Sequence, residues 1–310
     1  MLRCLSAALL LAMAMTGRAQ EAGMRSDRQA TAITFVGDVL LDRGVRERID
    51  TAGVDVLFSP SADSLLLASD LVVANLECPA THVVAPRHKK YIFRADPEHL
   101  AALRRHGFTH LNLANNHSID QGRRGLISTC DHIREAGMVV VGAGANMQEA
   151  AEPILLTKHP RRVWLLASLR LALENYAYLP EKPCVSQESM DSLVARVARL
   201  RHASPSDYII VTLHWGGENT MVPILQQVVD AHRLVDAGAN LIVGHHSHTL
   251  QPVETYHGAT IFYSIGNFIF DAHRDIHKKA CAVTVNVESD KAVVDSAEVF
   301  INDCTPVVRQ

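Results

Sequence analysis

Short apolar runs alternate with longer segments of helical periodicity along most of the chain. Many of the runs are rich in Val, Ile and Leu and end abruptly in polar residues, which is typical of strands buried in a sheet. We predict strands at Ala32–Val36, Leu71–Ala74, Phe108–Ala114, Met138–Val141, Ile154–Thr157, Val163–Ser168, Tyr208–Leu213, Asn240–Val243 and Thr260–Ser264, and a hairpin of Ala282–Val287 with Ala292–Ile301.

Helical segments lie between these runs and have recognisable ends. Asp96 can cap a helix that has Pro97 in its first turn, and Gly107 follows its last residue. The same reasoning predicts helices at Ala95–His106, Gly122–Ala136, Ser189–His202 and Pro223–Asp236. Strands that alternate with helices indicate an α/β core. We find no repeat and no later linker, so residues 32–310 are predicted to form one domain after a polar linker at residues 20–31.

The first nineteen residues have the pattern of a signal peptide. Arg3 gives a positive start, Leu5–Met15 is apolar, and Gly17 and Ala19 are the small residues of a cleavage site. The apolar run is short for a membrane span, which needs about 20 residues. We therefore expect a periplasmic or secreted protein. The alternative is an uncleaved N-terminal membrane anchor.

Charge and cysteine content exclude some classes of function. Removing residues 1–19 removes two arginines and no acids, so the formal charge changes from −3 to −5. A negative chain of this kind is not expected to bind nucleic acid. The remaining cysteines are odd in number, widely spaced and without a CxxC pair, which argues against a disulfide framework or a zinc knuckle. A single disulfide bridge between Cys281 and Cys304 remains an alternative.

Residues of the kind that bind metals follow the predicted strands. Asp38, Glu77, Asn116, His214 and the group His245, His246 and His248 all come just after a strand-like run. In open α/β sheets, ligand sites lie beyond the carboxyl ends of the strands. These side chains are therefore expected to meet at one edge of the core, where Gly37, Gly216 and Gly244 would let the backbone turn sharply.

Each of these residues also has an ordinary structural explanation. Asp38 alone could cap a turn, Glu77 could be a solvated loop acid, and His214 beside Trp215 could be a packed core histidine. Three histidines within His245–His248 are harder to explain by packing. The joint pattern, more than any single residue, predicts a metal site.

Several longer segments resemble the CapA family, which is named for poly-γ-glutamate capsule synthesis. The resemblance spans roughly residues 33–271. It is carried by VGDVLLDRG, VVANLECP, KYIFRADP, GFTHLNLANNHSIDQG, VVVGAGAN, VTLHWGGE, LIVGHHSHTLQPVE and IFYSIGNFIFD. It implies a calcineurin-like metallophosphatase fold, a four-layer α/β/β/α sandwich. It also implies a metal site at the positions that match the superfamily's motifs, which are Asp38, Glu77, Asn116, His117, His214, His246 and His248.

The chain departs from the superfamily pattern in three places. Leu40 stands where the first motif has a histidine, the second motif is Asn-x-Glu, and His245 is an additional histidine. Asp42 could supply the missing ligand, and His245 could belong to the ligating pair. The site could therefore hold one metal ion instead of two. Mixed carboxylate, amide and imidazole ligands favour Mn, Fe or Zn over calcium.

The same residues suggest a mechanism. Two metals about 4 Å apart can clamp a phosphoryl or carbonyl oxygen of a substrate. His117 would lie beside them and could protonate a leaving group, with Asp120 orienting its ring. Lys90 and Arg94 could receive an anionic chain. The alternative for these two is a solvated edge of the protein.

Two functions remain open from the sequence. One is a metal-dependent hydrolase or transferase acting on an anionic polymer such as poly-γ-glutamate. The other is a non-catalytic subunit that binds this polymer or the membrane proteins of capsule synthesis. The retained His117 favours catalysis, whereas the missing histidine at Leu40 favours the subunit. Fold alone does not decide between them.

Overall fold

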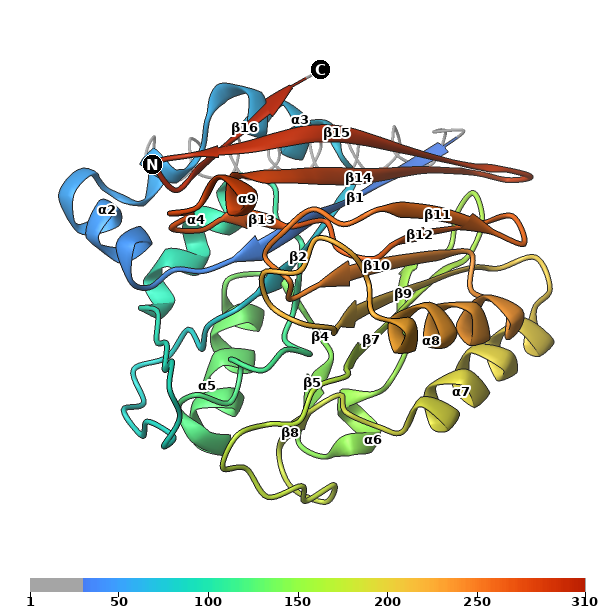
Figure 1. Ribbon diagram of the computed structural model, residues 1–310, viewed down its shortest axis with the longest axis horizontal. Helices are drawn as coiled ribbons and strands as arrows, with labels where there is room; N and C mark the ends of the chain where they lie inside the picture. The colour runs from blue at the N-terminus through green and yellow to red at the C-terminus, as the bar shows by residue number, and fades with distance from the viewer. Residues whose placement is uncertain (1–29, 310) are drawn as a thin grey trace, which may run out of the picture.

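The computed structural model describes residues 30–309. These residues form two β-sheets packed face to face, with helices on the outer side of each sheet (Figure 1). The predicted signal peptide and most of the predicted linker lie outside the described residues. The strand that follows begins at Ala30, so the last two residues of the predicted linker belong to the first strand.

The first sheet contains eight of the described strands and carries both termini of the described chain. Its order is β16-β15-β14-β1-β2-β3-β4, and β13 pairs with the end of β1. Parallel pairing joins β1 to β2, β2 to β3 and β3 to β4. The strands are β1 Ala30–Val39, β2 Leu71–Leu76, β3 His110–Asn112, β4 Val139–Val141, β13 Asn267–Ile269, β14 Lys279–Glu288, β15 Ala292–Asn302 and β16 Thr305–Arg309.

The second sheet contains six of the described strands in the order β11-β12-β10-β9-β7-β6. Its central strands β7, β9, β10 and β12 are parallel, so their carboxyl ends lie at one edge. The strands are β6 Ile154–Thr157, β7 Val163–Leu169, β9 Tyr208–His214, β10 Leu241–His245, β11 Val253–Tyr256 and β12 Ala259–Phe262. A small separate pair joins β5 (Ala143–Gly144) to β8 (Cys184–Val185).

Helices cover the outer faces of both sheets. The apolar sides of α2, α3, α4 and α5 join one core with the first sheet, and those of α7 and α8 join another with the second. The helices are α2 Gly44–Ala52, α3 Pro60–Ala68, α4 Leu100–Arg105, α5 Gly122–Glu135, α6 Met147–Ala150, α7 Met190–Ala203, α8 Leu225–Asp236 and α9 Asp275–Lys278, with 3-10 turns at Val54–Leu57 and Pro97–His99.

A third core fills the space between the two sheets. Phe35 and Val283 from the first sheet pack in the same apolar cluster as Ile210 and Val243 from the second. Alternate residues of β1 serve different cores, because Val36 packs on the helix side while Phe35 faces the other sheet. The expected four-layer α/β/β/α sandwich is the observed fold.

The elements differ from the prediction in several details. The helix expected at Ala95–His106 is a 3-10 turn followed by the short α4. Several other elements, among them α2, α3 and β13, were not predicted from the sequence. Cys281 and Cys304 are both free, so the bridge between them is not formed. No helix among residues 30–309 has the length and apolar character needed to cross a membrane.

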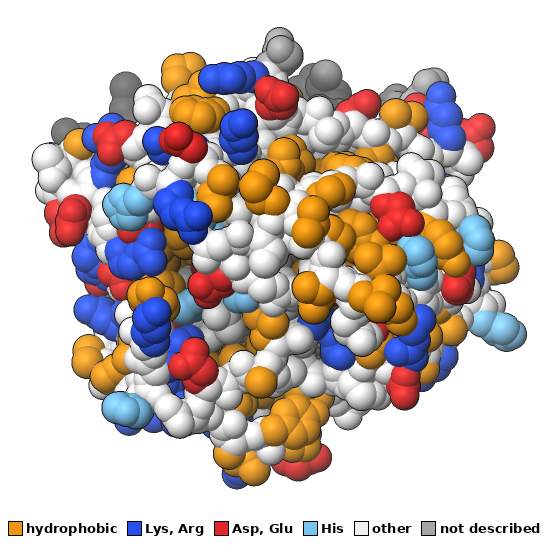
Figure 2. Space-filling view, in the orientation of Figure 1, with side chains coloured by type: hydrophobic (Ala, Val, Ile, Leu, Met, Phe, Trp, Pro, Cys, Tyr) orange, Lys and Arg blue, Asp and Glu red, His pale blue; other side chains and the backbone are white. Residues whose placement is uncertain are grey.

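Figure 2 shows charged and apolar side chains mixed over the visible face, with apolar ones gathered in the region of β11 and α8. Exposed apolar side chains also lie just before α8 and at its first residue. Val222 is 64% exposed and Leu225 is 78% exposed.

Candidate metal centre

The candidate ligands come from strand ends of both sheets. Asp38 lies near the end of β1, where it pairs with Asn75 of β2 on one side and Asn267 of β13 on the other. On the second sheet, His214 ends β9 and pairs with His245, which ends β10. The strand ends of the two sheets therefore bring these polar side chains toward one another.

Close backbone packing makes this meeting possible. A Cβ atom on Gly37 would lie 2.1 Å from the carbonyl oxygen of Gly266, and one on Gly244 would lie 1.9 Å from that of Tyr263. Gly37 and Gly244 are therefore required because the neighbouring backbone lies too close for a side chain. The prediction had attributed both glycines to sharp turns. Only Gly216 of the three has a positive φ, at 81°.

Asp38 is fully buried and well supplied with hydrogen-bond donors. Its Oδ1 accepts from Nδ2 of Asn75 at 2.8 Å and lies 3.0 Å from Nδ1 of His245. Its Oδ2 lies 3.3 Å from Nδ1 of His248. Burial acts to raise the pKa of Asp38, but the hydrogen bonds from His245 and His248 outweigh it and hold the pKa well below the usual range.

Glu77, directly after β2, is fully buried but lacks such donors. Neither of its carboxylate oxygens has a hydrogen-bond partner among the described residues. The histidine nitrogens close to it are Nε2 of His214, 3.1 Å from Oε1, and Nδ1 of His248, 3.7 Å from Oε2. Burial and the nearby charge of Asp38 raise the pKa of Glu77 well above its usual range. Glu77 can carry its negative charge in this position only with a positive charge nearby.

His214 and Asn116 approach each other from different sheets. Oδ1 of Asn116 lies 2.8 Å from Nε2 of His214. Atoms at adjacent positions around a cation, each about 2.1 Å from it, are about 3.0–3.4 Å apart. The spacing of the Asn116, His214 and Glu77 atoms is close to this range, as expected of ligands to one ion.

His246 and His248 are held in unusual backbone conformations. Their φ angles are 94° and 56°, in the left-handed region that residues other than glycine seldom adopt. Such conformations persist only where the surrounding structure enforces them, and they are common at functional sites. Nδ1 of His246 is buried and without a hydrogen-bond partner in the described chain. That nitrogen is available to bind a cation.

Two groups of side chains are close enough to hold metal ions. Glu77, His214 and His246 form one group, and Asp38, Glu77 and His248 form the other, with the potential ligand atoms of each group within 4.8 Å of one another. Glu77 belongs to both. The arrangement can therefore hold two cations with Glu77 between them, or one cation with the second group as its support.

The histidine pKa values fit this arrangement. Burial lowers the pKa of His214 well below its usual range and that of His246 to about 4, so both rings are neutral and able to donate a lone pair. Burial also acts to lower the pKa of His248, but Glu77 and Asp38 outweigh it and raise the pKa to about 9. Without a cation, a proton on His248 thus supplies positive charge between the two acids, and a metal ion bound by His248 would take the place of that proton.

His117 lies beside the ligands and is tightly supported. Its Nδ1 lies 2.9 Å from Oδ2 of Asp120, and its ring centroid lies 4.3 Å from that of Phe93. Nζ of Lys89 contacts Oδ1 of Asp120 at 2.7 Å and the carbonyl oxygen of Asn116 at 2.9 Å. Burial lowers the pKa of His117 against the opposing effect of Asp120. With Nδ1 engaged, Nε2 is the nitrogen left for proton exchange.

A cleft of about 240 Å³ opens beside this centre. His117 and His248 belong to its wall, together with Arg43, Phe93 and Phe270 among others. Of the candidate metal ligands His248 lines it, so a molecule in the cleft would contact both His248 and His117.

Some predicted residues lie elsewhere. Asp42 binds Arg46 at 3.1 Å and the backbone nitrogen of Arg94 at 2.8 Å, so it does not supply the ligand missing at Leu40. His245 reaches the centre only through Asp38, to which it is hydrogen-bonded. It therefore orients a candidate ligand.

The two residues expected to bind an anionic chain do not line the cleft. Lys90 is exposed, with Nζ 4.9 Å from the centre of the Tyr91 ring. The guanidinium of Arg94 binds the carbonyl oxygen of Thr81 at 3.1 Å and approaches Asp96. Neither residue is among those that line the cleft beside the candidate metal ligands, so their role in binding an anionic chain stays a prediction.

The sequence analysis missed four residues that shape the centre: Lys89, Arg43, Asn75 and Asn267. Asn267 contacts Nδ1 of His248 at 3.0 Å, and Nδ2 of Asn75 binds Asp38. Both asparagines pair in register with Asp38. Parallel pairing of two predicted strands could have revealed Asn75, whereas the strand of Asn267 was not predicted.

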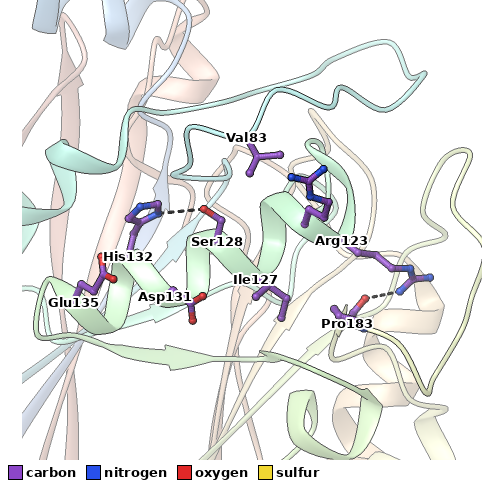
Figure 3. A pocket seen from close by; sticks show the side chains of 9 residues that line it. Val83, Arg123, Ile127, Ser128, Asp131, His132, Glu135 and Pro183 are labelled. Atoms are coloured by element: carbon purple, nitrogen blue, oxygen red, sulfur yellow. Dashed lines mark hydrogen bonds between the residues drawn. The ribbon is translucent and has the colours of Figure 1, made fainter.

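A larger hollow of about 510 Å³ lies along the exposed side of α5 (Figure 3). Arg123 there binds the carbonyl oxygen of Pro183, Asp131 pairs with Arg134 at 3.2 Å, and Ser128 lies 3.4 Å from Nδ1 of His132. It contains none of the candidate metal ligands, so the smaller cleft is the functional candidate.

Comparison with known proteins agrees with the fold and the motifs. A family model described as "Bacterial capsule synthesis protein PGA_cap" matches residues 32–272, which is more than half of the chain. The chain belongs to this family.

Named relatives cover most of the chain. The capsule biosynthesis protein CapA of Bacillus anthracis is 31% identical over 291 residues, covering 90% of this chain and 70% of that protein. The PGA biosynthesis protein CapA of Bacillus subtilis is 31% identical over 268 residues, covering 85% and 70%. A probable polyglutamine synthesis accessory protein of Mycobacterium tuberculosis is 34% identical over 219 residues, covering 66% and 56%.

Solved structures resemble this PGA_cap member in fold. A putative 5'-nucleotidase of Staphylococcus aureus has a TM-score of 0.54 at 13% identity, covering 90% of this chain and 54% of that one. The 5'-nucleotidase precursor of Thermus thermophilus has a TM-score of 0.51 at 14% identity, covering 89% and 56%. The chain spans little more than half of each. The likeness shows the expected metallophosphatase fold, without extending to substrate.

Proposed function

We propose that this protein is an exported, metal-dependent hydrolase or transferase that acts on an anionic polymer in capsule synthesis, with poly-γ-glutamate as the leading candidate. The family and the printed names of its relatives support the connection to this polymer. The observation that carries the metal dependence is Glu77, whose two buried oxygens lack hydrogen-bond donors and lie between histidines.

The residues fit one or two divalent ions of manganese, iron or zinc. Glu77, His214 and His246, with Asn116 alongside, would hold one ion, and Asp38, Glu77 and His248 would hold the other. Such ions polarise a carbonyl or phosphoryl oxygen. The mixture of nitrogen and oxygen ligands favours these metals over magnesium or calcium.

The chain's own residues supply proton transfer. Asp120 fixes the ring of His117 through Nδ1, and Lys89 fixes Asp120. This leaves Nε2 of His117 for proton exchange in the cleft, and it would give a proton to a leaving group when the ring carries protons on both nitrogens, a state that the neighbouring carboxylate of Asp120 favours. A general acid of this kind contributes about 10²–10⁴-fold to a rate.

A substrate panel tests this proposal. Purified protein loaded with manganese, iron or zinc would be assayed on phosphoesters, γ-glutamyl oligomers and poly-γ-glutamate, in parallel with the Asp120→Asn variant. We expect turnover of an anionic substrate that falls at least 10-fold in the variant. Polymer binding without turnover of any substrate would reject the enzyme and support the non-catalytic assembly subunit.

A further inference from the structure

Arg43 stands at the rim of the cleft in a conformation that needs support. It joins β1 to α2 with a φ of 54°, which is unusual for a residue with a Cβ atom. Its guanidinium lies between two aromatic rings, 5.4 Å from the centre of Phe93 and 5.4 Å from that of Phe270. Stacking on both rings restricts the plane of the guanidinium.

Asp271 fixes the same guanidinium from its inner edge. Nε of Arg43 binds Oδ2 of Asp271 at 2.9 Å, and Nη2 binds Oδ1. The Asp271 side chain is 5% exposed, whereas that of Arg43 is 36% exposed. Nη1 has no hydrogen-bond partner among residues 30–309. The outer edge of the guanidinium is therefore held in place and open to a ligand.

This free edge belongs to the cleft that also contains His117 and His248. Arg274 lies on the same rim, with Nη1 bound to Oδ1 of Asn219 at 3.0 Å. The cleft therefore contains two arginines, Arg43 and Arg274. Of these, Arg43 is held in one orientation by its ion pair with Asp271. Neither Lys90 nor Arg94 offers a comparable group there.

We infer that Arg43 is the anion-binding residue of this cleft. It receives an oxyanion carried by the substrate, at a distance from the group that reacts at the metal centre. This inference rests on the proposed function, because it names the substrate class for that same site. A carboxylate and a phosphate share the required chemistry, since both accept two hydrogen bonds from one edge of a guanidinium.

Calorimetric titration of the metal-loaded protein tests the inference. The probes are a γ-linked glutamate trimer, its uncharged amide analogue and inorganic phosphate. We expect Arg43→Gln to bind the preferred anion about 10–100-fold more weakly, because a charge-assisted hydrogen bond is lost. Preference for the trimer over its amide would identify a carboxylate, and tighter binding of phosphate would identify a phosphoryl group.

Arg48→Gln is the matched control, because Arg48 lies on α2, is similarly exposed and binds Asp303 at 2.7 Å, outside the cleft. It should bind the probes within about twofold of the parent. Arg43→Lys keeps the charge without the planar fork and should fall between the parent and Arg43→Gln.

Equal affinity of the parent and Arg43→Gln, or no anion binding by metal-loaded parent protein, would overturn the inference. Failure of the proposed function is seen separately as absence of bound metal or of turnover. A thermal melt of each variant confirms that it folds. If Arg43→Gln fails to fold, Arg43→Lys is tested in its place. An affinity of Arg43→Lys for the anion equal to that of the parent would then overturn the inference.

Discussion

Nε2 of His214 lies 3.1 Å from Oε1 of Glu77, although His214 ends a strand of the second sheet and Glu77 follows a strand of the first. Oδ1 of Asn116 lies 2.8 Å from the same nitrogen. The two sheets thus bring an acid, an amide and a neutral imidazole to one point. This convergence is the basis for the metal centre and for the predictions below.

Replacing His117 and His246 should separate chemistry from metal binding. We expect His117→Ala to keep its metal and to lose about 10²–10⁴-fold in turnover, because it removes a proton donor. His246→Ala should lose metal, because it removes a ligand from one of the two groups. Metal analysis and turnover of both variants check this, with the exposed His82 replaced by alanine as the control. Equal loss of metal in both would make His117 a ligand.

Gly37 should tolerate no side chain. A Cβ atom there would collide with the backbone of Gly266, and backbone cannot move aside as a flexible side chain can. We expect Gly37→Ala to lower the free energy of unfolding by about 1–3 kcal/mol or more. Gly217→Ala is the control, since its nearest contact would be an ordinary 3.4 Å. Urea unfolding of both variants measures the difference in stability. Similar stabilities would contradict the close approach of Gly37 to the backbone of Gly266.

Acid should destabilise the protein partly through His110. Burial lowers the pKa of His110 to about 4, while an unfolded histidine titrates near 6.5. Below about pH 6.5 the unfolded state therefore binds more protons at this residue, and stability falls with pH until the folded pKa is reached. Between pH 7 and pH 5 the parent should lose about 2 kcal/mol more than His110→Leu. Urea unfolding at both pH values tests this, and parallel losses would reject the effect.

The N-terminal pattern predicts a mature protein that begins near Gln20. Residues 1–19 have the charged, apolar and small-residue parts of a signal peptide. N-terminal sequencing of the protein from periplasmic or culture fractions measures the start. An intact Met1 on protein from the cytoplasmic fraction would contradict export, and an intact Met1 on membrane-bound protein would support the anchor.

Much of the candidate metal centre was predictable because its candidate ligands lie at or just beyond the ends of apolar strands. Asp38, Glu77, His214 and His246 each stand at a strand end, and parallel pairing places such ends together. The helix at Ala95–His106 was overestimated, because its start is a 3-10 turn. The N-terminal signal of α3, Ser59 followed by Pro60, was present and overlooked.

Other features depend on tertiary contacts that no local pattern shows. β13 has three residues and exists through its pairing with β1, so its Asn267 could not be placed beside His248 in advance. Lys89 and Lys90 look alike in the sequence. Only the fold buries Lys89 against Asp120 and leaves Lys90 exposed. For the same reason, anion binding was predicted for Arg94 and not for Arg43.

Metal content is the most direct test of the central claim. Purified protein would be reconstituted with manganese, iron or zinc, dialysed and analysed by elemental mass spectrometry, alongside Glu77→Gln and the control Glu98→Gln, whose carboxylate is 67% exposed. The account predicts one or two tightly bound ions per chain for the parent and the control, and affinity at least about 100-fold weaker for Glu77→Gln. A parent that retains none of these metals, or Glu77→Gln that retains them equally, would contradict it.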